Sequence, residues 1–349
     1  MNYNYTFPCV KGKQAKNDFY ICMIPCKLLS KLFPVQSDDV LPEFRAQRRL
    51  NEKRIPDIKD YILNNRHSYV FSALAASIDG CFSFKSTDGD VGVLVVPMES
   101  HFLINDGQHR NAAIQEALKE DPTLGEETIP VVFFEDKGLA RSQQMFTDLN
   151  KYAVKPSKSQ NTFYDHKDEL AILTKDIVNS VPFLRDYTDV ENDTLGKYSA
   201  KIFTLNSFYV ANQYVVGKNA LTVEIKDFCK EYWLILSSSI DEWQRLMCKD
   251  IAKKTLREDY IITQNIVLYA FGKLGNFLYE NNLNDLRKIL SKLKDINWLR
   301  TNPDWSGIAI ENGKISAKKN NISLTYIKIK ELVGVALEEK ERLMLKETK

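Results

Sequence analysis

The sequence predicts a mixed α/β (α+β) fold in its first half and a mainly α-helical second half. Three observations lead to this prediction. Strand-like and helix-like segments alternate through the first half, residues 101–118 change from an apolar run to a helical pattern at Asp106-Gly107, and helical periodicity dominates after Lys151. We therefore expect two domains, an α/β domain over residues 1–155 and a mainly helical domain over 156–349.

The apolar patterns of the first half predict its elements in order. Strands are expected at 20–29, 68–78, 91–97 and 129–134, and helices at 44–50, from Pro56 onward, and at 139–149. Pro56 suits the first turn of a helix, and Ile55, Ile58 and Ile62 recur at helical spacing around it. The turns Asp79-Gly80 and Asp88-Gly89 separate the strands.

The second half carries a series of helical patterns. We expect helices at 170–178, 220–236, 241–248, 260–279, 283–293 and 322–345, with a loop over 298–321. The polar, basic stretch around Pro156 predicts the connection between the two domains.

Composition limits the classes of function. With 349 residues, 44% of them hydrophobic and 27% charged, the chain is long enough for two cores. The net charge of +2 is nearly balanced, so a nucleic-acid surface has to come from local clusters. No window approaches the ~20 apolar residues of a membrane helix, and we expect a cytoplasmic protein. Cys22 and Cys26 lack the spacing of a metal site, which favours buried, reduced thiols.

The run Asp106-Gly107-Gln108-His109-Arg110 is the strongest candidate for a functional site. Gly107 allows a positive φ, and the start of the following helix offers free N–H groups and a positive dipole end to an anion. Asp106 could act as a helix cap, a metal ligand or a general base, and His109 is expected to be neutral at this position. An ordinary strand-to-helix turn is the competing interpretation.

Basic clusters before and after this run are candidate DNA contacts. The first is rich in arginine, whose guanidinium grips phosphate bidentately, and the second lies in the connection between the domains. Their members are Arg45, Gln47, Arg48, Arg49, Lys53 and Arg54, and then Lys151, Lys155 and Lys158. A solvated helix face and a plain basic linker are the alternatives. A third patch near Tyr326 could support DNA non-specifically, but a solvated surface is the simpler explanation. Its members are Lys314, Lys318, Lys319, Lys328 and Lys330.

Several segments together resemble one known family. The run Asp106-Gly107-Gln108-His109-Arg110, the preceding Gln47-Arg48-Arg49-Leu50, the apolar stretch 129–134 and the stretch 145–150 occur in the order shown by the DGQHR-domain proteins of the DNA phosphorothioation systems, the DndB family. The resemblance implies a first domain similar to the ParB/sulfiredoxin fold, in which a strand, a turn and a helix bearing Arg or His hold a nucleotide or a DNA phosphate. It assigns phosphate binding to His109 and Arg110, and it places Gln47 and Arg48, with Arg54, where ParB-like folds have a second phosphate-gripping arginine. Gly107 and Gln108 are candidate phosphate-binding residues from the local pattern alone.

The resemblance also implies a function. It favours a DNA-binding negative regulator of the genes for DNA phosphorothioation, with double-stranded DNA and other phosphorothioation proteins as partners, and we expect a homo-oligomer. The alternative is a ParB-like NTPase or nuclease that uses ATP or CTP with Mg²⁺, with Asp106 and His109 as catalytic residues and Asp106 as metal ligand. The few carboxylates near the motif favour binding over hydrolysis. A scaffold subunit of the same system is the third option.

Overall fold

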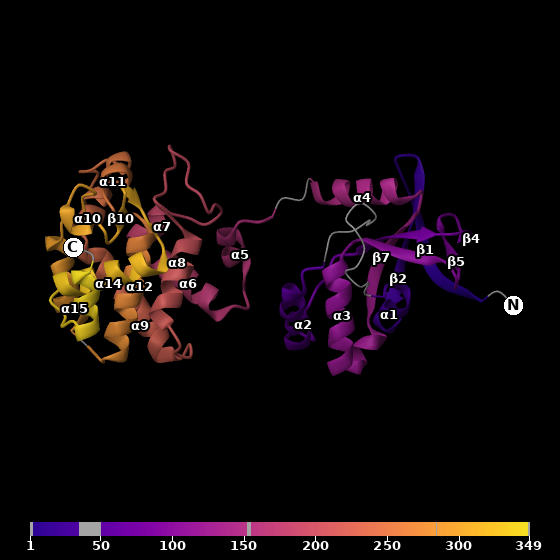
Figure 1. Ribbon diagram of the computed structural model, residues 1–349, viewed down its shortest axis with the longest axis horizontal. Helices are drawn as coiled ribbons and strands as arrows, with labels where there is room; N and C mark the ends of the chain where they lie inside the picture. The colour runs from indigo at the N-terminus through magenta and orange to yellow at the C-terminus, as the bar shows by residue number, and fades with distance from the viewer. Residues whose placement is uncertain (1–2, 35–49, 152–154, 284, 348–349) are drawn as a thin grey trace. The chain divides into compact units, whose positions relative to one another are not determined.

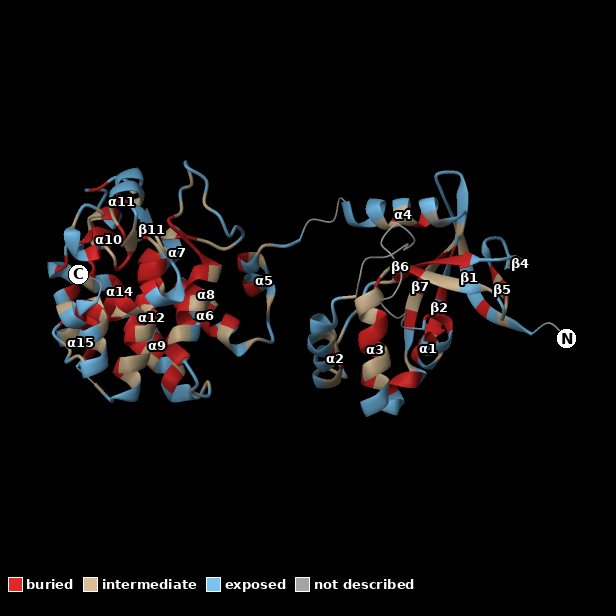
Figure 2. Ribbon diagram, in the orientation of Figure 1, coloured by how far each residue is buried: buried red, intermediate tan, exposed pale blue. Residues whose placement is uncertain are grey.

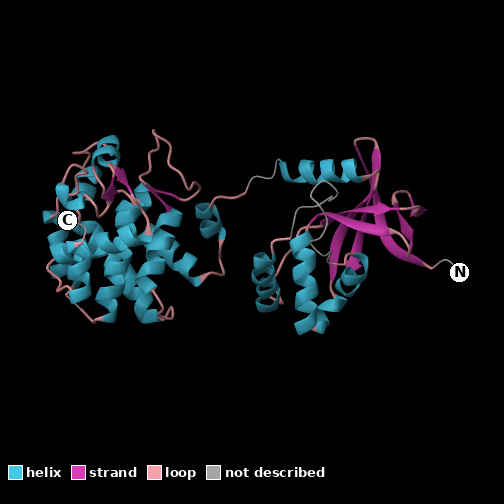
Figure 3. Ribbon diagram, viewed as in Figure 1, coloured by secondary structure: helices cyan, strands magenta, loops and turns pink. Residues whose placement is uncertain are grey.

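The computed structural model describes residues 3–34, 50–151, 155–283 and 285–347. The fold is mixed α/β, as predicted. The chain divides into two compact units, Met1–Val154 and Lys155–Lys349. The first unit holds a large sheet with helices on both faces, and the second is built almost entirely of helices (Figure 3).

A seven-stranded sheet organises the first unit, in the order β4-β5-β1-β2-β7-β3-β6. Its strands are β1 (Asn4–Gln14), β2 (Asn17–Pro25), β3 (Leu74–Asp79), β4 (Ser83–Asp88), β5 (Val91–Pro97), β6 (His101–Asp106) and β7 (Thr128–Glu135). All neighbouring strands are antiparallel except β3 and β7, which run parallel. The central strands alternate buried and more exposed residues, as expected when one face covers a core.

Helices cover both faces of this sheet. They are α1 (Leu29–Leu32), α2 (Ile55–Asn64), α3 (Gln108–Glu120) and α4 (Leu139–Lys151), together with the 3-10 turns η1 (Cys26–Leu28), η3 (Glu52–Arg54) and η4 (Pro122–Glu126). In Figure 1, α1, α2 and α3 lie on one side of the sheet and α4 on the other. The main core lies on the α1–α3 side, where the rings of Phe33, Phe102 and Phe133 pack against one another.

The second unit packs its helices around a core that contains Trp233, Trp243, Trp298 and Trp305. Its elements are α5 (Lys158–Tyr164), α6 (Glu169–Ser180), α7 (Pro182–Tyr187), β8 (Thr188–Asp189), β9 (Phe203–Thr204), α8 (Leu205–Val216), α9 (Val223–Ser239), α10 (Asp241–Met247), α11 (Lys253–Asp259), α12 (Asn265–Glu280), α13 (Leu286–Leu290), η5 (Ser291–Asp295), η6 (Pro303–Trp305), β10 (Ile310–Glu311), β11 (Lys314–Ile315), α14 (Lys319–Leu332) and α15 (Glu339–Lys346).

Helix α12 is the centre of this unit and is buried along much of its length (Figure 2). It contacts α8, α9 and α14. Gly272 permits the close approach of α8, because a Cβ there would lie 2.3 Å from the Ala211 carbonyl oxygen.

Most predicted elements are confirmed, with shifted ends. The strands at 91–97 and 129–134 and the helix at 139–149 are β5, β7 and α4. Several predictions were wrong in extent. The strand expected at 20–29 ends at Pro25, and the loop expected over 298–321 contains η6 and the short strands β10 and β11. Strand β3 begins only at Leu74, helix α12 begins only at Asn265, and the helix expected over 322–345 is two helices, α14 and α15, because Gly334 breaks the chain with a φ of 75°. The helix predicted at 44–50 lies outside the described residues.

The buried thiols were predicted correctly. Cys22 and Cys26 are 0% and 2% exposed. Burial raises the pKa of Cys26 to about 11 and raises the pKa of Cys22 further, so both thiols stay protonated at neutral pH. Among the described residues, no helix combines the length and the apolar character needed to span a bilayer.

Candidate functional site

The turn between β6 and α3 depends on Gly107. This residue has a φ of 102°, in the left-handed region, and it stands at the N-cap position of α3 without any side chain that caps the helix. A Cβ at this position would lie 2.3 Å from Leu74 Cδ2. Glycine is therefore required here on both conformational and steric grounds.

Arg110 ties this turn to the chain segment that leads into β3. Its Nη1 donates to the carbonyl oxygens of Ser72, at 2.6 Å, and Ala73, at 3.0 Å, and its Nη2 donates to Asp106 Oδ2 at 2.8 Å. Nη1 also contacts the Ser72 hydroxyl. The guanidinium thus holds three backbone segments in one arrangement. Its Nε–H has no acceptor among the described residues.

His109 holds the opposite side of the turn. Its Nε2 accepts a hydrogen bond of 3.0 Å from the backbone N–H of Asn51. The Asn51 side chain in turn caps η3, whose exposed Lys53 and Arg54 are the next cations along the chain. One hydrogen bond therefore fixes η3 to the first turn of α3.

The buried polar face of α3 binds a second segment. Asn111 Nδ2 and Gln115 Nε2 donate to the Phe33 carbonyl oxygen at 3.1 and 2.9 Å, and Gln115 also donates to Asn111 Oδ1. Phe33 and Asn51, which are distant from α3 in the sequence, are thus both bound to it.

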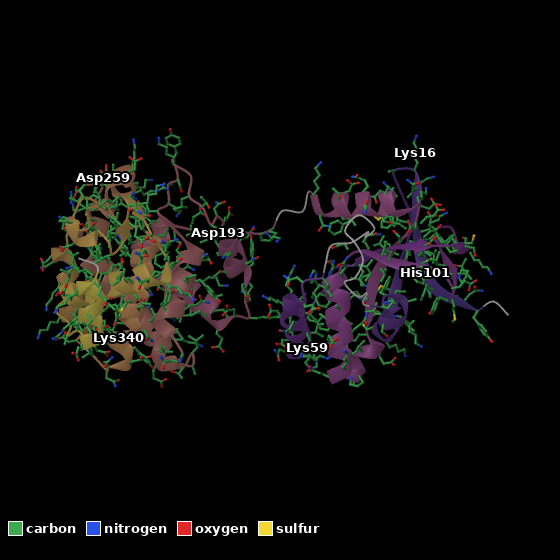
Figure 4. All side chains as sticks on the ribbon, viewed as in Figure 1. Lys16, Lys59, His101, Asp193, Asp259 and Lys340 are labelled. Atoms are coloured by element: carbon green, nitrogen blue, oxygen red, sulfur yellow. The ribbon has the colours of Figure 1, made fainter. Side chains whose placement is uncertain are left out.

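Two polar side chains beside the turn have unused hydrogen-bonding atoms. The sheet register shifts between Ala75 and Ala76, which leaves Asn105 as an extra residue in β6, the strand that starts at His101 (Figure 4). Asn105 is fully buried and donates to Ser77 Oγ, but its Oδ1 has no partner among the residues that the structure describes. The Nε2 of Gln108, at the first position of α3, is also buried without a partner in the described structure. Such atoms are uncommon in folded proteins.

A family model named DndB and described as DNA-sulfur modification-associated matches residues 7–336, nearly the whole chain. The chain belongs to the DndB family. This confirms the resemblance seen in the sequence and gives the chain a role in the DNA sulfur modification system. No curated protein and no solved structure matches it.

The structure brings together part of the predicted site of this DndB-family chain. Asp106 to Arg110 surround the β6–α3 turn, and Arg54 follows the residue bound by His109. Gln47 and the cations Arg45, Arg48 and Arg49 lie outside the described residues. Lys151 ends α4 in the first unit, whereas Lys155 and Lys158 belong to the second.

The environment of Asp106 gives it one clear partner. It accepts from Arg110, and its side chain is 45% exposed. Within the described ranges, no group of three or more His, Cys, Asp and Glu side chains converges as a metal site would require.

Three of the five lysines in the third patch form ion pairs within the protein. Lys318 pairs with Glu311 at 2.9 Å, whereas Lys314 and Lys319 are exposed. Lys330 is fully buried and pairs with Glu341 at 2.8 Å, and Lys328 bridges Asp304 and Glu331. This supports a structural explanation for that patch.

Sequence reasoning missed several residues that shape the turn. Ser72 and Ala73 contribute mainly backbone carbonyls, which leave no trace in residue type. Asn111 and Gln115 did carry a signal, because two polar residues at i, i+4 beside the apolar run 112–114 indicate buried hydrogen bonds.

Proposed function

We propose that this chain is a DNA-binding negative regulator of the DNA sulfur modification genes and that the start of α3 binds a DNA phosphate. The observation that carries the proposal is the buried Nε2 of Gln108, which has no partner in the described structure and lies at the start of α3, where the N-cap residue Gly107 has no side chain to cap the helix. A helix start without a cap offers N–H donors and a positive dipole end, and an amide N–H adds a further donor. Membership of the DndB family supports DNA as the source of the phosphate.

In this proposal Arg110 is mainly a positioning residue. Its guanidinium is 18% exposed and its Nη atoms bond to Ser72, Ala73 and Asp106, so it fixes the shape of the turn. The Nε–H remains for a phosphate oxygen.

The electrostatic part of the proposed interface comes from η3. Lys53 and Arg54 are exposed and follow Asn51, which is bonded to His109. Arg48 and Arg49 lie three and two residues before Asn51 in the sequence and are the next candidates. Contacts of this kind position DNA without reading its sequence.

The test is binding of the full chain to labelled duplex DNA over a series of salt concentrations. Gln108→Glu keeps a helix-compatible side chain but places a negative charge at the proposed phosphate site, and we expect it to weaken binding strongly. Arg54→Gln should reduce the slope of log affinity against log salt by about one. Lys119→Gln is the matched control, because it also removes one exposed cation. Lys119 lies at the C-terminal end of α3, away from the proposed site, and pairs with Glu116.

Equal effects of Arg54→Gln and Lys119→Gln would contradict the proposed interface. The same reactions are run with ATP or CTP plus Mg²⁺ while phosphate release is measured. Release that is lost in an Asp106→Asn variant would favour the nucleotide-hydrolysing alternative instead.

A further inference from the structure

A polar cavity lies entirely within the helical unit, where α8 and α12 begin. Its volume is about 380 Å³, within the range of small-molecule sites. It is lined by Thr204 and Ser207 at the start of α8, by Arg257 of α11 and by Thr263, Gln264 and Asn265 at the start of α12. None of these residues takes part in the α3 site.

Helix α12 begins at this cavity without a cap. The N-cap residue, Gln264, makes no side-chain bond to the first turn, whereas Thr204 caps α8 by accepting from the Ser207 N–H. With 16 residues, α12 is long enough for a full helix dipole, whose positive end lies at its N-terminus. The backbone N–H groups at this end are the donors that an anion would accept from, except that of Val267, which donates to the Gln264 carbonyl.

Buried hydroxyl groups beside this helix start have protons without acceptors. Thr204 and Ser207 are 6% and 2% exposed and share a single hydroxyl–hydroxyl bond of 2.7 Å. That bond uses one of their two hydroxyl protons, and the described residues supply no acceptor for the other. Thr263, 6% exposed, accepts from Gln264 Nε2 but likewise has no acceptor for its own proton in the described structure. Buried donors of this kind normally find a partner.

The charge at the cavity is also incompletely compensated. Arg257 donates to the carbonyls of Leu195 and Gly196, and no described carboxylate lies within ion-pair distance of its guanidinium. Asp193, labelled in Figure 4, is the acidic residue in the lining, but its oxygens already accept from Lys158 N and from the N–H and hydroxyl of Ser159. The open hydrogen-bonding capacity is therefore mainly that of donors.

We propose that this cavity binds a small phosphorylated compound through its phosphoryl group. A phosphoryl group provides several acceptor oxygens and negative charge, which match an uncapped helix start, an unpaired guanidinium and two buried hydroxyl donors. The cavity leaves room beyond the phosphoryl group for the compound that carries it.

The test is calorimetric titration of the full chain with inorganic phosphate and, separately, with adenosine monophosphate. The decisive variant is Gln264→Asp, which caps α12 and so preserves the fold but puts a carboxylate where the phosphoryl group binds. Gln264→Asn is the matched neutral control. We expect at least about a tenfold loss of affinity in Gln264→Asp and little change in Gln264→Asn, the loss corresponding to an opposed charge in a site of this kind.

Binding of either compound with this pattern supports the proposal. Binding that Gln264→Asp leaves unchanged, an equal loss in both variants, or no binding of either compound overturns it. The titrations are repeated in a Gln108→Glu background, in which the start of α3 no longer contributes phosphate binding, and DNA binding is measured separately, so failure of the DNA-binding proposal and failure of this one are distinguishable. A thermal melt of Gln264→Asp without phosphate verifies that the variant is folded.

Discussion

Asp106 and Arg110, four residues apart at the β6–α3 turn, are joined by an ion pair of 2.8 Å. The arginine does more than neutralise the aspartate, because the same guanidinium also holds the carbonyls of Ser72 and Ala73. The two ends of the Asp-Gly-Gln-His-Arg motif therefore close on each other around Gly107, which is buried, and Gln108, which begins α3.

Replacing Arg110 should cost more stability than replacing Asp106. Arg110→Ala leaves two carbonyls and a carboxylate without their donor, and we expect it to lower the free energy of unfolding by about 1–3 kcal/mol. Asp106→Ala removes one contact at a side chain that is 45% exposed, so its cost should be clearly smaller. Urea denaturation of the two variants measures the difference. Equal costs would mean that the bonds to Ser72 and Ala73 contribute little.

Gly107→Ala should destabilise the first unit through both strain and a clash. A positive φ alone costs a non-glycine residue about 1–3 kcal/mol at most sites. At Gly107 a Cβ would in addition lie 2.3 Å from Leu74 Cδ2. Gly138→Ala is the matched control, since Gly138 has a φ of 95° and open space where its Cβ would stand. We expect a larger shift of the urea midpoint for Gly107→Ala; indistinguishable midpoints would show that Leu74 moves away without cost.

The buried pair of Lys330 and Glu341 gives a prediction for the second unit. Lys330 is fully buried over the ring of Phe277 at 3.7 Å, and Glu341 is its ionic partner. Glu341→Gln leaves an uncompensated buried ammonium and should cost about 3–5 kcal/mol. Lys330→Met keeps the volume and leaves Glu341 bonded to the Glu338 N–H, so it should cost much less. Thermal unfolding of both variants checks that Glu341→Gln is the more destabilising one. The opposite order would mean that the Lys330 ammonium stays hydrated in the Glu341→Gln variant.

The thiol of Cys26 predicts a loss of stability at alkaline pH. Burial raises its pKa from 9.0 to about 11. Below pH 9 the thiol is protonated in both states and makes no difference. Above it the unfolded chain loses the proton first, so stability falls until the folded thiol also ionises, by about 3 kcal/mol for a shift of this size.

The measurement is urea unfolding from about pH 8 to about pH 11, a range that runs from below the ordinary thiol pKa to the raised pKa of Cys26. Cys26→Ala serves as the control, because it removes the ionisation, and its stability should decline less steeply with pH than that of the parent chain. Parallel declines would assign the alkaline sensitivity to other buried groups, such as Cys22 or Tyr69, whose pKa values burial also raises.

Local signals explain which parts of the fold were predictable. Strand β7 and helix α4 follow from their own periodicity, and the turn at Gly107 follows from an Asp-Gly pair between an apolar run and a helical pattern. Strand β1 was missed because it contains Pro8 and Gly12 although β2 and β5 pair with it on both sides. Its turn to β2 takes positive φ at Ala15 and Lys16, neither of which is a typical turn residue.

The geometry of the candidate site was less accessible than its location. The motif named the correct turn, but two of the partners of Arg110 are backbone carbonyls that lie 37 and 38 residues earlier. The bond from Asn51 to His109 spans 58 residues. Contacts of this range depend on how β3 and α2 are placed against α3, and that placement is set by tertiary packing rather than by the residues of the motif.

The pairing of β2 with β7 has a consequence for how the chain acquires its shape. Phe19 stands opposite Phe134, so the two strands at the middle of the sheet come from opposite ends of the first unit. The β1–β2 hairpin can form as soon as it leaves the ribosome, but its free edge has no partner until Glu135 has been synthesised. During that interval the backbone N–H and C=O groups along this edge of β2 are unpaired. The sheet can be completed only by contacts between residues that are distant in the sequence. We expect the slow step in the folding of this unit to be the insertion of β7 between β2 and β3.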